Sequence, residues 1–271
     1  MPAKKTTEAG PTDKPEYRVE ALAKGLRILS LFDEQRPSWR VSDLATVAGL
    51  PMPTVYRVVM TLTAEGYLEH LPNGDYRPGV RTLTLGTAAL RSLDLVGIAT
   101  PKLHRLGETT GETVNLAVLS GDQVLYLIRL RNSDLVTANI QVGSTLPAVT
   151  TSIGKLLLAH LDPADLDERI TEDSFRIQRG PNAKGSLAEL RKDLKTIREQ
   201  GWAMQNEELA YGLRSIAGPI FGETGSIVAG VNVAVQSRDW DPDRILQELR
   251  PAVLETCAEI SALLREGHVQ S

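Results

Sequence analysis

The chain has 271 residues, of which 42% are hydrophobic and 24% are charged, and its formal net charge at pH 7 is −4. This length suits one large or two modest domains of an ordinary soluble protein. No apolar run approaches the roughly 18 residues that a membrane span needs, and the start of the chain lacks the apolar core of a signal peptide. Cys257 is the only cysteine, and the four histidines are scattered. We therefore expect a cytoplasmic protein without membrane contact, disulfide or metal site.

The first 34 residues divide into a polar tail and a helix. Residues 1–17 are rich in Lys, Thr, Pro and Glu and have too few apolar groups to offset the entropy lost on ordering, which predicts a disordered tail. Residues 18–34 have helical spacing, and Arg36 and Pro37 end this helix. Its apolar side chains, expected in the core, are Val19, Leu22, Leu26, Ile28, Leu29, Leu31 and Phe32.

Residues 41–66 predict two helices joined by a tight turn. Ser42 is expected to cap the first helix, and Gly49 supplies the left-handed residue that ends it. Pro53 marks the first turn of the second helix, and Gly66 ends that helix. The apolar stripes of the two helices are Leu44, Val47 and Ala48, then Val55, Val58, Val59 and Leu62.

The outer face of the second helix is the candidate DNA-reading surface. At about 100° per residue, Pro53 and Arg57 point most directly away from the apolar stripe. Thr54, Tyr56, Met60 and Thr61 flank them. We expect these side chains to meet the major groove, with Tyr56 either contacting a phosphate or stacking on the following hairpin.

A hairpin follows the second helix. Two short strands flank Pro72, Asn73 and Gly74. An Asn-Gly dipeptide is a strong hairpin signal, because both central residues of that turn need positive φ. Two helices alone are also compatible with a plain helical hairpin. The β-hairpin at this distance favours a winged helix-turn-helix.

Residues 1–80 contain ten basic and ten acidic residues, so this region has no net charge. Arg36, Arg40, Arg57 and Arg77 lie in or beside the motif and can still provide a local positive face. Modest affinity per protomer favours a homodimer or a dimer of dimers on a palindromic operator.

The remainder of the chain predicts an α+β domain. We expect a linker helix over 82–97, with a second helix over about 99–110 beyond the breaks at Gly97 and Pro101. The predicted strands are 114–119, 123–131, 135–142, 213–221 and 226–235, the last two joined by a hairpin at 222–225. The predicted helices are 151–161, 163–170, 186–201 and about 241–265. Grouped strands and helices indicate an antiparallel sheet covered by helices on one or both faces.

Three segments carry a family resemblance: LPMPTVYRVVMTLTAEGYLE, GSTLPAVTTSIGKLLLA and QGWAMQNEELAYGLRSIAGPIFGETGSIVAGVNVA. In these segments and their order the chain resembles IclR-family transcriptional regulators from about Tyr17 to about Gly267. The resemblance implies a winged domain over 18–81 and an effector-binding domain over 98–267 with a GAF-like or profilin-like fold. It also implies pairing as dimers of dimers. A Ser-Thr-Thr run common in the family stands here as Pro53-Thr54-Val55, which leaves the operator sequence open.

Combining the pattern with the resemblance, the expected DNA-binding residues are Arg40, Ser42, Met52, Pro53, Thr54, Tyr56, Arg57, Thr61, Asn73 and Arg77. The expected effector-binding residues are Leu146, Ala148, Thr150, Thr151, Ser152, Ile153, Gly154, Gln205, Ser215, Asn232 and Ala234. The backbone N–H groups of 151–154 start a helix and would attract a carboxylate. Ala148 and Ala234 would leave volume for the ligand.

Strand alternation places Asn232 and Ala234 on one face and Val231 and Val233 on the other. Asn232 and Ser215 are also compatible with ordinary polar positions in a strand. Arg214 lies in an apolar strand, and we expect it to form a buried structural pair with Glu207 or Glu208.

An enzyme is the alternative of another class, because Ser152 and Lys155 have the Ser-x-x-Lys spacing of a serine nucleophile and a lysine base. The partner motifs of such hydrolases do not follow, and Val149 and Leu156 break the pattern of a phosphate-binding loop. We therefore expect no enzyme activity and no cofactor.

The resulting hypothesis is a regulator that binds a double-stranded DNA operator and a small carboxylate effector. A catabolic operon, with aromatic-acid degradation first, is the expected target. A central keto-acid pathway with a glyoxylate-type or pyruvate-type effector is the alternative.

Overall fold

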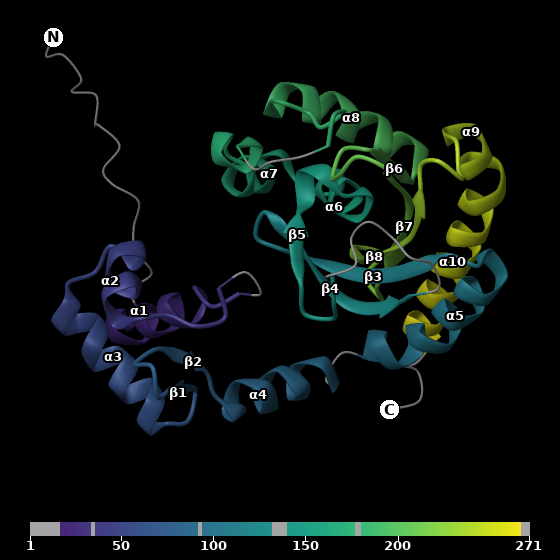
Figure 1. Ribbon diagram of the computed structural model, residues 1–271. Coiled ribbons are helices and arrows are strands. Elements are labelled where there is room, and N and C mark those ends of the chain that lie inside the picture. The colour runs from purple at the N-terminus through teal and green to yellow at the C-terminus, as the bar shows by residue number, and fades with distance from the viewer. Residues whose placement is uncertain (1–16, 34–35, 92–93, 132–139, 177–179, 267–271) are drawn as a thin grey trace, which may run out of the picture. The chain divides into compact units, whose positions relative to one another are not determined.

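The computed structural model describes residues 17–33, 36–91, 94–131, 140–176 and 180–266. The chain divides into two compact units, Met1–Ala88 and Ala89–Ser271, each with its own core (Figure 1). Apart from Tyr17, the tail expected over 1–17 lies outside the described residues. In the described part of the chain, no helix is long and apolar enough to cross a bilayer.

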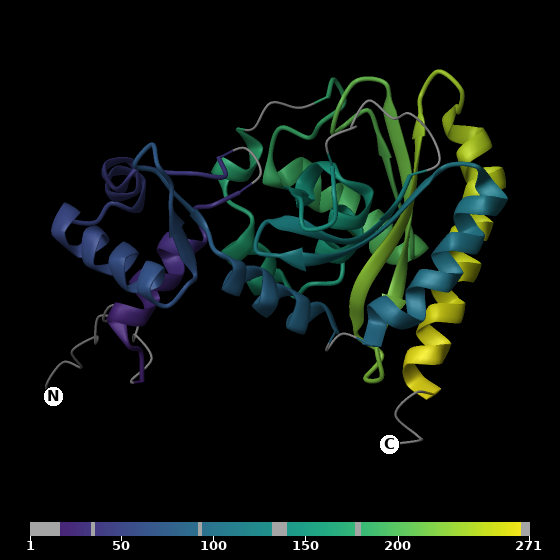
Figure 2. The same cartoon turned by 60° about the horizontal axis from the view of Figure 1, so that its bottom comes forward.

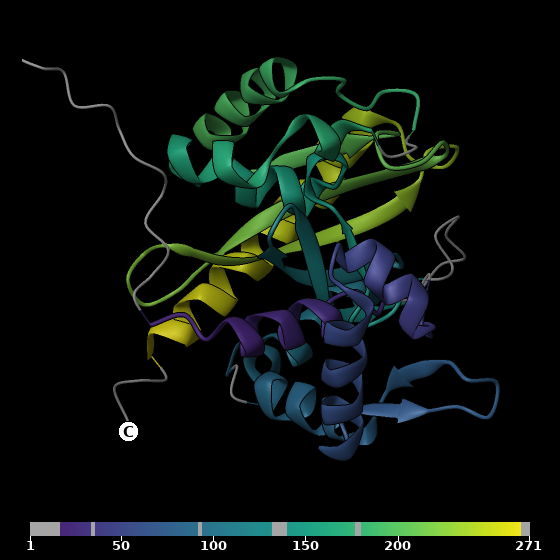
Figure 3. The same ribbon diagram turned by 90° about the vertical axis from the view of Figure 1, so that its left-hand side faces the viewer.

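The N-terminal unit is three helices followed by a two-stranded hairpin, which Figure 3 shows projecting beyond the end of α3. Its elements are α1 Glu20–Leu29, α2 Val41–Ala48, α3 Met52–Ala64, β1 Leu68–His70 and β2 Tyr76–Pro78. Its core consists of Ile28, Trp39, Leu44, Ala45, Val55, Val59, Leu68 and Tyr76. Trp39 joins the hairpin through two backbone hydrogen bonds with Tyr76, so the wing is tied to the segment before α2.

The first helix is shorter than predicted and turns a different face inward. It ends at Leu29, and Leu31 and Phe32 reach the core from the segment that follows. Three residues expected in this core are exposed instead, namely Val19, Leu22 and Leu26. Their helical spacing was correct, but periodicity does not say which apolar stripe has a partner within the chain.

Two details of α2 differ from the prediction. Arg40 is the N-cap and Ser42 lies inside the first turn, where its hydroxyl donates to Asp43, so Ser42 does not cap the helix. Val47 is 55% exposed, and Ala45 takes its place in the core. Gly49 does end the helix in the left-handed region, with φ +60°.

The hairpin is confirmed, but its turn type was wrong. Of the two central residues of the expected turn, Asn73 does not have a positive φ, and Pro72 favours the second position of a type I turn that starts at Leu71. In the loop only Gly74 has a positive φ, +86°. The Gly74 N–H donates to the Leu71 carbonyl at 3.0 Å, and the Leu71 N–H donates to the Asp75 carbonyl at 2.8 Å. The turn is therefore a three-residue connection with the glycine in the left-handed position.

The C-terminal unit is built on one six-stranded antiparallel sheet with the order β5-β4-β3-β8-β7-β6. Its strands are β3 Thr113–Ser120, β4 Gln123–Leu130, β5 Thr145–Pro147, β6 Ala203–Asn206, β7 Leu213–Phe221 and β8 Ile227–Gln236. The short β6 was missed. Of the strand predicted over 135–142, residues 135–139 lie outside the described residues and 140–142 are not a strand; β5 follows them.

Helices cover both faces of this sheet, as Figure 2 shows. The helices of this unit are α5 Asp94–Thr110, α6 Ser152–Leu158, α7 Pro163–Arg169, α8 Leu187–Gln200, α9 Pro242–Arg244 and α10 Arg250–Glu266. α4 Val80–Arg91 precedes them, and the boundary between the two units falls within it, after Ala88. Single turns at Ala148–Thr150 and Glu172–Phe175 and a π-helical stretch at Ile245–Leu249 complete the set. α5 and α10 pack on one face, and α6 with α8 behind it packs on the other, so the predicted α+β architecture is confirmed.

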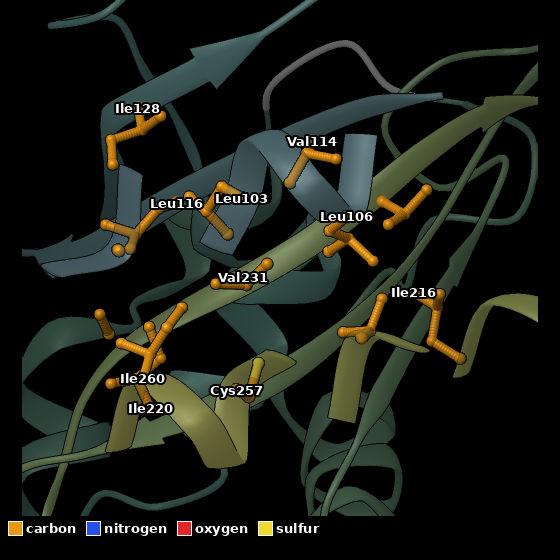
Figure 4. Packing of buried hydrophobic residues seen from close by; sticks show 14 of the residues in the cluster. Leu103, Leu106, Val114, Leu116, Ile128, Ile216, Ile220, Val231, Cys257 and Ile260 are labelled. Carbon is orange, nitrogen blue, oxygen red and sulfur yellow. The ribbon is translucent and has the colours of Figure 1, made fainter. Parts of the chain in front are cut away.

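Gly97 and Pro101 do not break the helix as expected, because both lie inside α5. α4 ends at Arg91 and α5 begins at Asp94, and residues 92–93 between them lie outside the described residues. An internal proline costs a helix about 3 kcal/mol. Burial of Leu95, Ala99, Leu103 and Leu106 offsets that cost. Figure 4 shows Leu103 and Leu106 in the cluster that contains Val231 of β8 and Ile260 of α10.

Candidate functional site

The outer face of α3 is exposed as predicted. Pro53, Tyr56, Arg57, Met60 and Thr61 are exposed, Thr54 is half-buried, and Val55 and Val59 are fully buried beneath them. Pro53 lies at the N-terminal end of the helix, next to Met52, which is also exposed. The face is therefore free to contact a large partner such as a DNA groove.

Arg57 differs from the other arginines of this unit. Arg36 pairs with Asp43 at 2.6 Å, Arg77 of β2 pairs with Glu69 of β1 at 2.9 Å, and Arg40 lies 3.4 Å from Asp75. In the described part of the chain, Arg57 makes no ion pair and no side-chain hydrogen bond. Its charge is thus available to a ligand outside the chain.

The hairpin residue expected to contact DNA is engaged locally. Asn73 donates to the Asp75 carboxylate at 3.0 Å and accepts from the Asp75 N–H at 3.1 Å. These bonds hold the loop between β1 and β2 in shape, and Asn73 itself stays exposed.

In the C-terminal unit, β8 alternates as predicted. Val231 and Val233 lie in the core with α5 and α10, and Asn232 and Ala234 lie on the opposite face. A small cavity opens there, which we call the sheet cavity. Its polar lining is Asn115, Tyr126, Arg129, Thr151, Gln205, Ser215 and Asn232, and its apolar lining is Ile140, Leu209, Leu213 and Ala234. Its free volume is about 20 Å³, enough for about one water molecule.

A continuous set of hydrogen bonds joins four of these polar side chains through Ser152. Asn115 donates to the Asn232 Oδ1 at 2.8 Å, and Asn232 donates through Nδ2 to the Ser152 Oγ at 3.2 Å. The Ser152 and Ser215 hydroxyls lie 2.7 Å apart. Arg129 donates to the Asn115 Oδ1 at 3.1 Å. Because buried polar groups are costly when unpaired, this network fixes the orientation of each member.

Gln205 lines the sheet cavity but lies outside this hydrogen-bonded set. Its side chain is 1% exposed, and its Oε1 accepts from the Glu208 N–H at 2.8 Å. Among the residues that the structure describes, none is a hydrogen-bond partner of its Nε2. The amide is therefore oriented by one bond and keeps two N–H donors free at the sheet cavity.

Five of the predicted effector residues line the sheet cavity, namely Thr151, Gln205, Ser215, Asn232 and Ala234, and Ser152 is bonded to two of them. Leu146, Ala148, Thr150, Ile153 and Gly154 do not line it. Ala148 was expected to leave volume for the ligand. It is completely buried in the core around α6 instead.

Gly154 has a structural role that explains its residue type. A Cβ at this position would lie 2.2 Å from the Ala148 carbonyl oxygen, so only glycine allows the backbone before α6 to approach this closely. The expected attraction of the helix N-terminus for a carboxylate is not supported. α6 has only seven residues, and the Gly154 N–H already donates to the Thr151 hydroxyl at 3.0 Å.

Lys155 is held away from Ser152 by two carboxylates. Its Nζ lies 2.6 Å from the Glu208 Oε1 and 2.9 Å from an Asp193 oxygen, and its side chain is almost fully buried. Burial raises the pKa of Glu208, while the nearby ammonium of Lys155 opposes that shift. A lysine bound in this way is not positioned as a base for a serine nucleophile.

Arg214 is not paired as expected. It donates to the Asn206 side chain at 2.6 Å and to the carbonyl oxygens of Ser237 and Trp240 at 2.8 and 2.6 Å. The buried pair with Glu208 belongs to Lys155 instead. Glu207 accepts from the Gly212 N–H and from the Ser237 hydroxyl, both at 2.8 Å.

Comparison with known proteins agrees with this arrangement. Residues 21–72 match the family model of the IclR helix-turn-helix domain, and residues 87–262 match that of the bacterial transcriptional regulator IclR C-terminal domain. The chain belongs to the IclR family of transcriptional regulators. It has the helix-turn-helix DNA-binding domain and the effector-binding C-terminal domain of that family, whose members are regulators, so the hydrolase alternative is rejected.

Relatives match along most of their length. The Pca regulon regulatory protein of Pseudomonas putida is 30% identical over 250 residues, covering 92% of this chain and 85% of that protein. The regulator BhcR of Paracoccus denitrificans is 34% identical over 245 residues, covering 90% of this chain and 86% of that protein. An IclR homologue from Microbacterium hydrocarbonoxydans, solved in complex with 4-hydroxybenzoate, aligns with a TM-score of 0.70 at 28% identity, covering 91% of this chain and 100% of that one.

Sequence reasoning missed Asn115, Tyr126 and Arg129 as lining residues. A signal was present, because Asn115 pairs across the sheet with both Arg129 of β4 and Asn232 of β8. Directly paired residues share a face. Reading that signal requires the strand register, which the separate strand patterns do not give.

Proposed function

We propose that this IclR-family regulator controls a catabolic operon in response to a small carboxylate bound in the sheet cavity. The observation that carries the proposal is a small cavity with several hydrogen-bond donors and an apolar border. Sites for small ligands combine an apolar lining with a few placed polar groups in this way. The 4-hydroxybenzoate complex of a relative supports an aromatic acid as the first candidate.

A second candidate is a two- or three-carbon keto acid. The free volume of about 20 Å³ favours it, because a small acid requires less displacement of the lining than an aromatic ring. An aromatic ligand would have to move Leu209, which lies in the loop between β6 and β7.

The DNA side of the proposal uses the expected residues of the N-terminal unit. Arg57 and its neighbours on α3 read the base edges in the major groove. Arg40, Ser42, Asn73 and Arg77 contact the sugar-phosphate backbone of the DNA. We propose a homodimer or a dimer of dimers on a palindromic operator, acting in the cytoplasm, where the operator lies. Sedimentation of the full chain with and without operator DNA tests this, and a stable monomer that binds tightly would contradict it.

Calorimetric titration of the full chain decides the effector class. The ligands are benzoate, 4-hydroxybenzoate, a six-carbon dicarboxylate, glyoxylate and pyruvate, and each is also tested for operator release by fluorescence anisotropy. We expect the binding acid to shift operator affinity by a coupling energy of about 1–3 kcal/mol. If none of these acids binds or releases the operator, the carboxylate proposal is rejected.

A further inference from the structure

The polar lining of the sheet cavity runs across the sheet with different chemistry at its two ends. Arg129 lies on β4 and Gln205 on β6, with β3, β8 and β7 between them. Four intervals of about 4.8 Å separate these two backbones by roughly 19 Å along the sheet, a gap that the two side chains shorten. A ligand with two separated oxygen functions therefore suits this spacing better than one short group does.

The Arg129 end is suited to a carboxylate. Among the lining residues that the structure describes, Arg129 alone has a formal charge, because burial raises the pKa of Tyr126 to about 12 and keeps that phenol neutral. A planar guanidinium offers paired N–H donors that match the two oxygens of a carboxylate. One of the Arg129 N–H groups donates to the neutral Asn115 oxygen at 3.1 Å. Hydrogen bonds between charged partners are stronger than bonds to a neutral oxygen.

The Gln205 end is suited to a second oxygen. The Glu208 N–H holds the Gln205 Oε1 at 2.8 Å, which fixes the amide and leaves the unpaired Nε2 at the cavity. A buried donor without a partner is destabilising, so an acceptor oxygen of a ligand is favoured there. Between the two ends the lining includes Leu213 and Ala234, which accommodate a hydrocarbon middle.

We infer that the effector is a two-ended acid, with its carboxylate bound by Arg129 and a second oxygen function, hydroxyl or carboxyl, bound by Gln205. This inference rests on the proposed function and names the ligand class within it. A hydroxylated aromatic acid or a longer dicarboxylic acid meets both ends, whereas a two-carbon acid meets only one. Arg129 thus selects for the negative charge of the effector, and Gln205 selects for an effector long enough to place a second oxygen beside it.

The test is calorimetry on the full-length protein with 4-hydroxybenzoate, its methyl ester, benzoate, a six-carbon dicarboxylate, glyoxylate and pyruvate. The parent should bind a two-ended acid roughly 10- to 100-fold more tightly than the ester or benzoate, as loss of one charged or buried hydrogen bond predicts. Arg129→Gln should remove the preference for acid over ester, and Arg129→Lys should restore part of it. Gln205→Leu should remove the preference for 4-hydroxybenzoate over benzoate.

Arg131→Gln is the matched control, since Arg131 is exposed and outside the lining but the variant loses the same charge. It should bind like the parent, and a thermal melt confirms that each variant is folded. If Arg129→Gln binds and discriminates as the parent does, the inference is overturned while the regulator remains effector-responsive. Binding confined to glyoxylate and pyruvate overturns the two-ended ligand and leaves the keto-acid function standing. Failure of every acid to bind rejects the inference together with the proposed function.

Discussion

The outer face of α3 and the sheet cavity are both polar surfaces, but they are built in different ways. The α3 face comes from one helix, and all of its side chains except that of Thr54 are exposed; the Thr61 hydroxyl donates to the Arg57 carbonyl one turn earlier. The sheet cavity draws on β3, β4, β6, β7, β8 and the start of α6, and four of its polar side chains belong to one hydrogen-bonded set that passes through Ser152. Substitutions on the α3 face should therefore have independent effects, whereas substitutions in the hydrogen-bonded set of the sheet cavity should affect one another.

The largest effect is expected at the buried charges beside the sheet cavity. Lys155→Met leaves Glu208 buried without its cation and removes one partner of Asp193. Breaking a buried pair on one side typically costs about 3–5 kcal/mol, so we expect the free energy of unfolding in denaturant to fall by that amount. Replacing an exposed lysine of α8, Lys192→Met, should change it by less than about 0.5 kcal/mol.

A second change separates a real charge penalty from lost packing. Adding Glu208→Gln to Lys155→Met removes the stranded carboxylate and should recover part of the lost stability. If the double variant is no more stable than Lys155→Met, the buried carboxylate is not the cause of the loss.

The α3 face should show the opposite behaviour. Arg57→Ala should lower the preference for operator over random DNA by about 1–3 kcal/mol, the value of a bidentate contact between arginine and guanine. The free energy of unfolding should change by less than about 0.5 kcal/mol, because Arg57 is exposed and has no side-chain partner among the described residues. Footprints at physiological salt measure the first quantity, and indistinguishable footprints would remove Arg57 from the contact set.

The same contrast explains how far the sequence could be used for prediction. The winged unit follows from local signals, such as the left-handed Gly49 and the exposed Arg57 opposite Val55 and Val59. Local rules failed where two of them competed: Pro72 favours a type I turn that starts at Leu71, whereas Asn73-Gly74 favours the two-residue turn that was expected.

In the C-terminal unit, alternation placed Asn232 and Ala234 correctly, because it needs only one strand. The roles of Arg129 and Lys155 depend on pairing across 14 and 53 residues of sequence, respectively. No periodicity within a segment carries that information. The inward stripe of α1 was also unpredictable in part, since exposed and buried apolar residues share the same spacing.

Coupling within each surface can be measured directly. Ser152→Ala and Asn232→Ala remove adjoining members of one hydrogen-bonded set, and their double-mutant cycle should give a coupling energy of at least about 0.5 kcal/mol in stability. Tyr56→Ala and Arg57→Ala are consecutive on a helix and do not face each other. Their effects should add to within about 0.3–0.5 kcal/mol. Equal coupling in the two cycles would contradict the distinction between the surfaces.

The smallest effect concerns the loop that carries Leu209. Glu207 starts this loop, and hydrogen bonds from the Gly212 N–H and then the Ser237 hydroxyl lower the pKa of its carboxyl. A carboxyl whose pKa is lower in the folded state stabilises the fold above its unfolded pKa, near 4.5, and this contribution is lost as the pH falls through the folded value. Glu207→Gln keeps an acceptor oxygen but not the charge. We therefore expect it to be less stable than the parent by under about 1 kcal/mol at pH 7, given its solvent exposure, and equally stable in acid. Ser237→Ala, which removes one donor, should move the acid loss of stability toward higher pH. Unfolding free energies from pH 3 to 7 that differ by a constant amount between parent and Glu207→Gln would show that this carboxylate does not hold the loop.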